Sequence, residues 1–154
     1  MSADEESRRM IRVISTLFAL AVFWAAPCHA ESPVTDLQRM EGTWNLKYGE
    51  KANKPLTPAE VKAMQIRITG PLLAILSEGK LVNQATLTIE PTKEPKEMKM
   101  DSPDGKHSVL GIYKLGKDEL QICWDNRPGV KPATFSGVND AGSLIYMRLV
   151  KAAP

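Results

Sequence analysis

The sequence has few of the residues from which catalytic and metal sites are built. Its 154 residues include only two cysteines and two histidines. It contains no Gly-rich phosphate loop, no GxSxG nucleophile motif and no HExxH zinc motif. No cysteine or carboxylate lies near His107 at the spacing of a metal site. We therefore expect no catalytic residues, no metal and no cofactor.

An excess of charge of one sign is also missing. The chain has 20 basic and 18 acidic residues, a net charge of +2. Around residues 93–99, lysines alternate with glutamates and do not form a basic stripe. Nucleic-acid surfaces need clustered Lys and Arg. We therefore expect no nucleic-acid partner.

No apolar run is long enough to span a bilayer well, which takes about 20 residues. An uncharged apolar run covers residues 13–26, and arginines precede it within residues 8–12. Small residues stand at positions −3 and −1 of a cut after Ala30. This order predicts a cleaved signal peptide over 1–30. The domain over 31–154 is then exported, periplasmic or secreted, with no transmembrane segment.

Two details of this leader leave alternatives open. Acidic residues at 4–6 are unusual before a basic segment, and a start at Met10 instead of Met1 gives a more typical leader. Cys28 raises the alternative of a lipoprotein anchored through an acylated cysteine. Pro27 argues against that anchor, because it stands where the signal has Gly or Ala.

After cleavage Cys123 is the only cysteine, so no internal disulfide can form and the domain must rely on core burial. Strand alternation places Cys123 opposite Ile122 and Trp124. We expect a packed structural thiol. A reactive thiol stays open as an alternative, since a fold can bring a distant partner close. We expect His107, beside a turn, to be solvent-exposed.

Period-two alternation of apolar and polar residues dominates the rest of the chain. Turn signals separate the segments, as in an antiparallel barrel or sandwich. Thr57-Pro58-Ala59-Glu60 has the pattern of a capped helix start, which predicts one short helix to about Met64. The prediction is an all-β single domain of eight strands, over residues 43–48, 65–69, 72–77, 81–90, 97–102, 107–115, 119–124 and 144–151.

Gly42-Thr43-Trp44 opens the first predicted strand, and Arg148 lies in the last one. This arrangement resembles the lipocalin-like (calycin) barrels. In those families the tryptophan packs across the closed end, and a basic side chain from the last strand lies over its ring. The resemblance implies that Trp44 and Arg148 form this barrel-end pair.

A closer resemblance covers most of residues 31–154. Leu37-x-x-x-Glu41-Gly42-Thr43-Trp44 is similar to the opening of a small, functionally uncharacterised lipocalin-like family that is abundant in planctomycete bacteria. Lys131 departs from it, since Arg is expected before the proline. The resemblance implies an eight-stranded lipocalin-like barrel and export, and brings no catalytic residues. The motif positions are Gly42, Pro91, Pro95, Gly111, Tyr113, Cys123, Trp124, Pro132 and Phe135.

An eight-stranded barrel is either filled by its own side chains or holds one small ligand. The first hypothesis is a small, partly apolar ligand in the barrel, with Tyr48, Met98 and Met100 as candidate lining residues. The alternative is a filled barrel that contacts an envelope protein through loops 53–57, 91–95 and 126–131. A third hypothesis is an enzyme that uses Cys123 or His107. Expected inward residues are Trp44, Leu46, Tyr48, Ile66, Ile68, Leu87, Ile89, Met98, Met100, Ile122 and Trp124.

Overall fold

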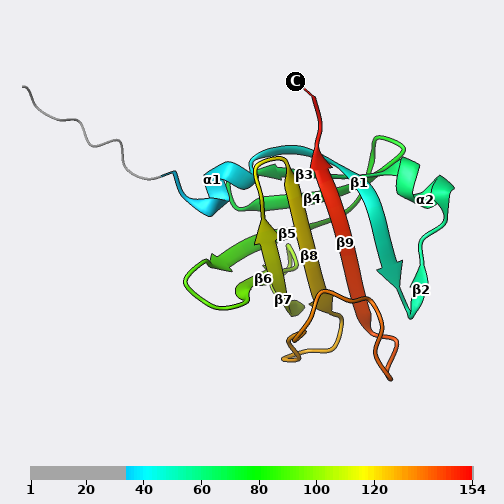
Figure 1. Ribbon diagram of the computed structural model, residues 1–154. Helices are drawn as coiled ribbons and strands as arrows, with labels where there is room; N and C mark the ends of the chain where they lie inside the picture. The colour runs from blue at the N-terminus through cyan, green and yellow to red at the C-terminus, as the bar shows by residue number, and fades with distance from the viewer. Residues whose placement is uncertain (1–33, 154) are drawn as a thin grey trace, which may run out of the picture. The chain divides into compact units, whose positions relative to one another are not determined.

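Nine antiparallel strands and two short helices make up residues 34–153, the part of the chain that the computed structural model describes (Figure 1). The predicted signal peptide, its cleavage site and Cys28 lie outside these residues. The helices are α1 (Asp36–Met40) and α2 (Pro58–Ala63). The strands are β1 (Gly42–Lys51), β2 (Lys54–Pro55), β3 (Met64–Thr69), β4 (Leu72–Ser77), β5 (Lys80–Glu90), β6 (Lys96–Asp101), β7 (Ser108–Leu115), β8 (Glu119–Asp125) and β9 (Leu144–Lys151).

The sheet closes on itself because the first long strand pairs with the last. From β3 to β9 each strand is antiparallel to the next along the chain, and β1 pairs with both β3 and β9. The two-residue strand β2 pairs only with the end of β1. The remaining eight strands form a closed barrel, which leaves few free sheet edges. This confirms the predicted all-β, eight-stranded barrel.

Both helices begin with the same capping arrangement. In α2, the Thr57 side chain accepts from the Glu60 amide and the Glu60 carboxylate accepts from the Thr57 amide, as the sequence predicts. In α1, Thr35 and Gln38 form the same reciprocal pair. The prediction of a single short helix is therefore wrong. Helix α1 has only five residues, too few to produce a helical apolar period in the sequence.

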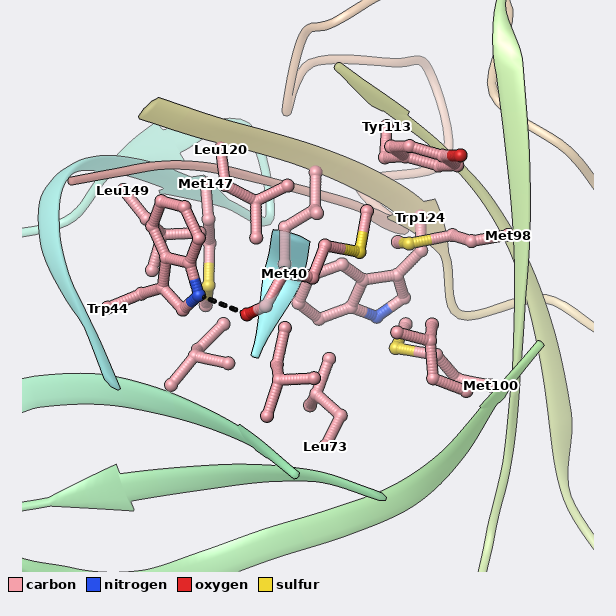
Figure 2. Close-up of a cluster of buried hydrophobic side chains, with 14 of the residues drawn as sticks. Met40, Trp44, Leu73, Met98, Met100, Tyr113, Leu120, Trp124, Met147 and Leu149 are labelled. Atoms are coloured by element: carbon pink, nitrogen blue, oxygen red, sulfur yellow. Dashed lines mark hydrogen bonds between the residues drawn. The ribbon is translucent and has the colours of Figure 1, made fainter. Parts of the chain in front are cut away.

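The inner face of the barrel carries the main apolar core (Figure 2). Ile66, Ile68 and Leu87 are at most 3% exposed. The predicted inward residues are confirmed except for Tyr48. Further inward residues come from the last two strands, where the side-chain period of two places Leu120, Ile145, Met147 and Leu149 on the same face as Ile122 and Trp124.

A β-bulge in β1 reverses the direction of Tyr48. Leu46 pairs with Leu149 of β9, but Tyr48 pairs with the next residue, Arg148, so Lys47 is extra. One added residue moves the following side chain to the other face of the sheet. Tyr48 is therefore 39% exposed on the outer face, and its hydroxyl donates to Glu50 Oε1 at 2.6 Å. The prediction of Tyr48 as an inward, ligand-lining residue is wrong.

A second, smaller apolar cluster lies on the outer face of β7, β8 and β9. The connection between β8 and β9, residues 126–143, contributes Phe135 to this cluster and is buried at Pro132. We call residues 126–143 the outer loop (orange in Figure 1). This outer cluster, as we call it, consists of Ile112, Cys123 and Leu144, with Phe135 and Tyr146 packed against them.

Candidate functional site

Trp44 closes one end of the barrel. Its side chain is completely buried, and its indole Nε1 donates to the carbonyl oxygen of Met40 at 2.7 Å (Figure 2). Helix α1 ends at Met40, which is itself 1% exposed. The helix and the indole together fill the interior of this end of the barrel.

The basic side chain over Trp44 is Lys151. Its Nζ lies 5.4 Å from the Trp44 ring centroid, and the two residues are paired between β1 and β9. Arg148 lies on the outer face, with its Nε 3.8 Å from a carboxylate oxygen of Glu119. The prediction of Arg148 as the partner is wrong. Side chains alternate along β9, so Leu149 and Lys151 lie on its inner face and Arg148 lies on its outer face.

Asp36 fastens helix α1 to the barrel. Its carboxylate accepts from Lys96 Nζ at 2.6 Å, from Tyr113 Oη at 3.0 Å and from Arg39 at 3.2 Å. Burial raises the pKa of this carboxyl, but the hydrogen bonds from Lys96 and Tyr113 outweigh burial, so the pKa is lowered overall. Burial and the same hydrogen bond raise the pKa of Tyr113. Motif position Tyr113 therefore has a structural role in closing the barrel.

The other end of the barrel is hollow. Trp44 and Lys151 mark the closed end of β1 and β9, whereas Lys51 and Ile145 lie at the opposite ends of the same strands. Two adjoining cavities open there, an inner one of about 140 Å³ and an outer one of about 280 Å³. We call this region the mouth. Both cavities are lined by Ile75, Asn83, Trp124 and Asn126.

The inner cavity has an apolar floor and a polar rim. Leu73, Met100 and Trp124 are buried below it, and half-buried aliphatic side chains form its walls. At the rim, Asn126 Oδ1 accepts from Trp124 Nε1 at 3.1 Å. This contact fixes the orientation of the buried indole, with its N–H bonded at the rim. The remaining named lining residues are Ile75, Asn83, Gln84, Ala85, Ser102, His107 and Val109.

The outer cavity combines aliphatic walls with one charged side chain. Leu56, Met64, Ile145 and Met147 supply most of the apolar surface. Lys51 is the charged residue of this lining. An arrangement of apolar walls with a few polar groups at one edge is typical of a site for a small organic molecule.

The two methionines that were expected to line a ligand site lie in different parts of the barrel interior. Met100 lines the inner cavity, as predicted. Met98 packs in the filled part of the core at 3% exposure, outside the lining of either mouth cavity. Its Cε would lie 2.8 Å from a Cβ added to Gly111. The missing side chain at motif position Gly111 therefore makes room for Met98 between β6 and β7.

Cys123 is fully buried in the outer cluster, as predicted for a structural thiol. Its Sγ donates to the carbonyl oxygen of Ser136 at 3.3 Å. Burial raises the pKa of Cys123 to about 11, which keeps it protonated near neutral pH. His107 is exposed at the mouth, as predicted.

The other motif positions lie away from the mouth, apart from Trp124. Pro91 is exposed and Pro95, after a cis peptide bond, is half-buried in the β5–β6 connection. Gly42 has φ +121°, a conformation that favours glycine, where β1 begins. Pro132 and Phe135 place the outer loop on the outer cluster.

Sequence reasoning missed Asp125, the one buried charged residue in the described part of the chain, at 1% exposure. Its carboxylate accepts from Arg127 Nε at 3.0 Å and from a second guanidinium nitrogen at 2.7 Å. These hydrogen bonds lower the pKa of Asp125 to about 2. The Asp-x-Arg spacing directly after a strand could have indicated this pair. Lys51, Asn83 and Asn126 were also missed as mouth residues.

Comparison with protein-family models, with curated proteins and with solved structures gave no match to this chain. Within residues 34–153, no group of three or more His, Cys, Asp or Glu side chains is arranged to hold a metal ion. Neither α1 nor α2 has the length and apolar character needed to cross a membrane.

Proposed function

We propose that this protein is an exported lipocalin-like domain that binds one small, partly apolar ligand in the mouth of its barrel. The observation that carries the proposal is the pair of adjoining cavities that meet at Trp124. This large aromatic side chain, held by Asn126, lines both cavities. Aromatic faces contribute strongly to binding small organic molecules.

The cavity volumes favour a small ligand. Protein sites for drug-sized molecules have volumes of roughly 300–1,000 Å³, whereas the two cavities measure about 140 and 280 Å³. A dry cavity of about 150 Å³ holds one benzene molecule. The inner cavity thus suits one ring or a short chain, and the outer cavity suits the rest of the ligand.

The lipocalin-like assignment is supported by the closed end. Gly42 stands at the entry of β1, Trp44 fills the barrel below it, and a basic side chain from the last strand covers the indole. That residue is Lys151, which replaces the expected Arg148 in the same role. Export is supported by the order of basic, apolar and small residues over 1–30.

The filled-barrel alternative has weaker support. It places a protein contact on loops 53–57, 91–95 and 126–131. Within residues 34–153, none of the exposed large hydrophobic side chains lies in these three loops. Surfaces that bind proteins are enriched in such side chains at their centre.

Native mass spectrometry of the protein purified from its own host tests the proposal. We expect an additional mass of one small molecule that disappears on denaturation. Ala85 lines the inner cavity and Thr86, next to it, is exposed on the outer face. The variant Ala85→Leu should fill the cavity and lose the added mass, whereas Thr86→Leu should keep it. A bare protein mass in the wild type would contradict the proposal and favour a protein partner.

A further inference from the structure

The charge of the mouth indicates the chemical class of the ligand. Among the side chains that line the two cavities, Lys51 is the one with a fixed charge, and no aspartate or glutamate is present. The other polar groups at the edge are neutral amides and a hydroxyl, together with His107. The lining therefore offers hydrogen-bond donors and one cation and contains no carboxylate, although Asp104 accepts from the rim residue Ser102 just outside it.

Lys51 forms no direct salt bridge with a carboxylate of the described part of the chain. Within residues 34–153 it takes part in none of the ion pairs. The nearest carboxylate along the chain, Glu50, is engaged on the outer face by the Tyr48 hydroxyl and the Gly137 amide, each at 2.6 Å. Glu60 accepts from the Thr57 amide and hydroxyl at 2.7 and 2.8 Å. Both carboxylates hold the fold through these hydrogen bonds, and neither forms a salt bridge with Lys51, although, after the hydrogen bonds from Thr57, the charge of Lys51 contributes to the lowered pKa of Glu60.

A second cation stands directly opposite the first. Lys51 pairs with Lys54 across the two-residue turn formed by Ala52 and Asn53, both of which have positive φ. Like charges directly opposite each other on paired strands are destabilising. An anion bound between these ammonium groups and the mouth would relieve that repulsion.

We infer that the ligand is a small carboxylate, with its apolar part in the inner cavity and its charged group beside Lys51. This inference rests on the function proposed above. The inner cavity accepts one aromatic ring or a short alkyl chain, by the volume argument already given. The rim lining contains lysine and no arginine. It presents a point charge that suits a single carboxylate and lacks the planar fork that holds phosphate in two bonds.

Three probes of matched shape test the inference: 4-phenylbutyrate, 4-phenylbutan-1-ol and 4-phenylbutylamine. Binding is followed by NMR through the indole N–H of Trp124, which is identified by its loss in the variant Trp124→Phe. The indole N–H of Trp44, at the closed end, serves as an internal control. We expect the acid to shift the Trp124 signal and to leave the Trp44 signal in place.

The expected order of affinity is acid, then alcohol, then amine. At low salt the acid should bind about fivefold more tightly than the alcohol, the preference that one exposed ion pair supplies, and added salt should reduce this difference. The variant Lys51→Met should remove the preference for the acid. Lys114→Met, an exposed lysine on the outer face of β7, should retain it.

The outcomes separate this inference from the proposed function. Equal affinity for acid and alcohol in the wild type, or an acid preference that survives Lys51→Met, would overturn the inference and leave the ligand site standing. If none of the three probes shifts the Trp124 signal, both the inference and the proposed site are overturned.

Discussion

At the scale of single residues, Trp44 determines where the barrel is filled. Its ring is buried, its N–H is bonded to the Met40 carbonyl, and Lys151 covers it. Each of these contacts uses a different part of the side chain: its apolar surface, its polar atom and its π-face. No smaller residue reproduces all three.

Truncation of Trp44 should strongly destabilise the protein. We expect Trp44→Ala to lower the free energy of unfolding by about 3–5 kcal/mol, because it leaves a cavity and removes a buried hydrogen bond. Trp44→Phe should lose less, since it keeps most of the apolar volume. Urea denaturation measures both. A loss of under about 1 kcal/mol for Trp44→Ala would rule out the role of this residue in closing the barrel.

The contact between Lys151 and Trp44 should be measurable as a coupling. In a double-mutant cycle, Lys151→Met and Trp44→Leu should show an interaction of about 0.5–1 kcal/mol, as expected for an exposed cation–π contact. Arg148→Met with Trp44→Leu should be additive, because Arg148 points outward. Coupling with Arg148 and none with Lys151 would contradict the observed pairing.

At the scale of elements, the outer loop is fixed along its length, at Ser136 by the Cys123 thiol, at Lys131 by Glu97 of β6 and at three further places. Arg127 is bonded to Asp125 at its start, the Gly137 amide donates to Glu50, and the Asn139 amide donates to Asn53 Oδ1 at 2.9 Å. Its first residue, Asn126, is also the rim residue that holds Trp124. The same loop therefore protects the outer cluster and shapes the mouth.

Acid should weaken the attachment of this loop. The pKa of Asp125 is lowered from 3.8 to about 2 in the folded chain, so its contribution is present above about pH 4 and is lost as the pH falls toward 2. We expect Asp125 to account for about 2 kcal/mol of the stability that the wild type loses over this interval. Compared with the wild type, Asp125→Asn should have a lower free energy of unfolding near neutral pH and should lose less of it on acidification. Asp140 is an exposed residue of the same loop, so Asp140→Asn should show the same dependence of unfolding free energy on pH as the wild type.

The loop should also open when its contact with β1 is blocked. A Cβ added to Gly137 would lie 3.0 Å from the Glu50 backbone and still closer to its Cβ, so Gly137→Ala should lift the loop from the barrel. Cys123, buried beneath it, then reports the opening. In a Cys28→Ser background, we expect thiol-reagent labelling of Cys123 to be much faster in Gly137→Ala. Thr134→Ala, at an exposed position of the loop, should label at the wild-type rate.

At the scale of the whole molecule, alternation was sufficient to predict an all-β domain of eight antiparallel strands, and the resemblance to lipocalin-like barrels favoured a barrel over a sandwich. Residues such as Ile66, Ile68, Met98 and Met100 face inward because strands have a period of two and one side of a closed sheet must be dry. The capped start of α2 was equally readable, since Thr57, Pro58 and Glu60 each satisfy a local rule of helix geometry.

What could not be predicted depends on strand register and on distance across the fold. The bulge at Lys47 leaves no mark in the sequence, yet it moves Tyr48 to the outer face. Lys51 and Asn126 are far apart along the chain and meet only because β1 and β8 end on the same side of the barrel. The choice between Arg148 and Lys151 likewise needed the pairing of β9 with β1.

Closure should make the barrel unfold as one unit. Leu149 is fully buried at the seam where β9 meets β1. We expect Leu149→Ala to lower the free energy of unfolding by about 2–5 kcal/mol, in a single transition that tryptophan fluorescence and far-UV circular dichroism report alike. Val150 is the neighbouring residue on the outer face, and Val150→Ala should lower the free energy of unfolding by less. Separate transitions for the two probes would contradict a single closed unit.

The pairing of β1 with β9 also determines when the barrel can close during synthesis. The partner of the first strand is the last one to be synthesised, so Trp44 has no final cover until Lys151 has left the ribosome. Until then the unfinished sheet has two open edges and an exposed apolar inner face. Such a chain cannot complete its core until the last strand pairs with the first.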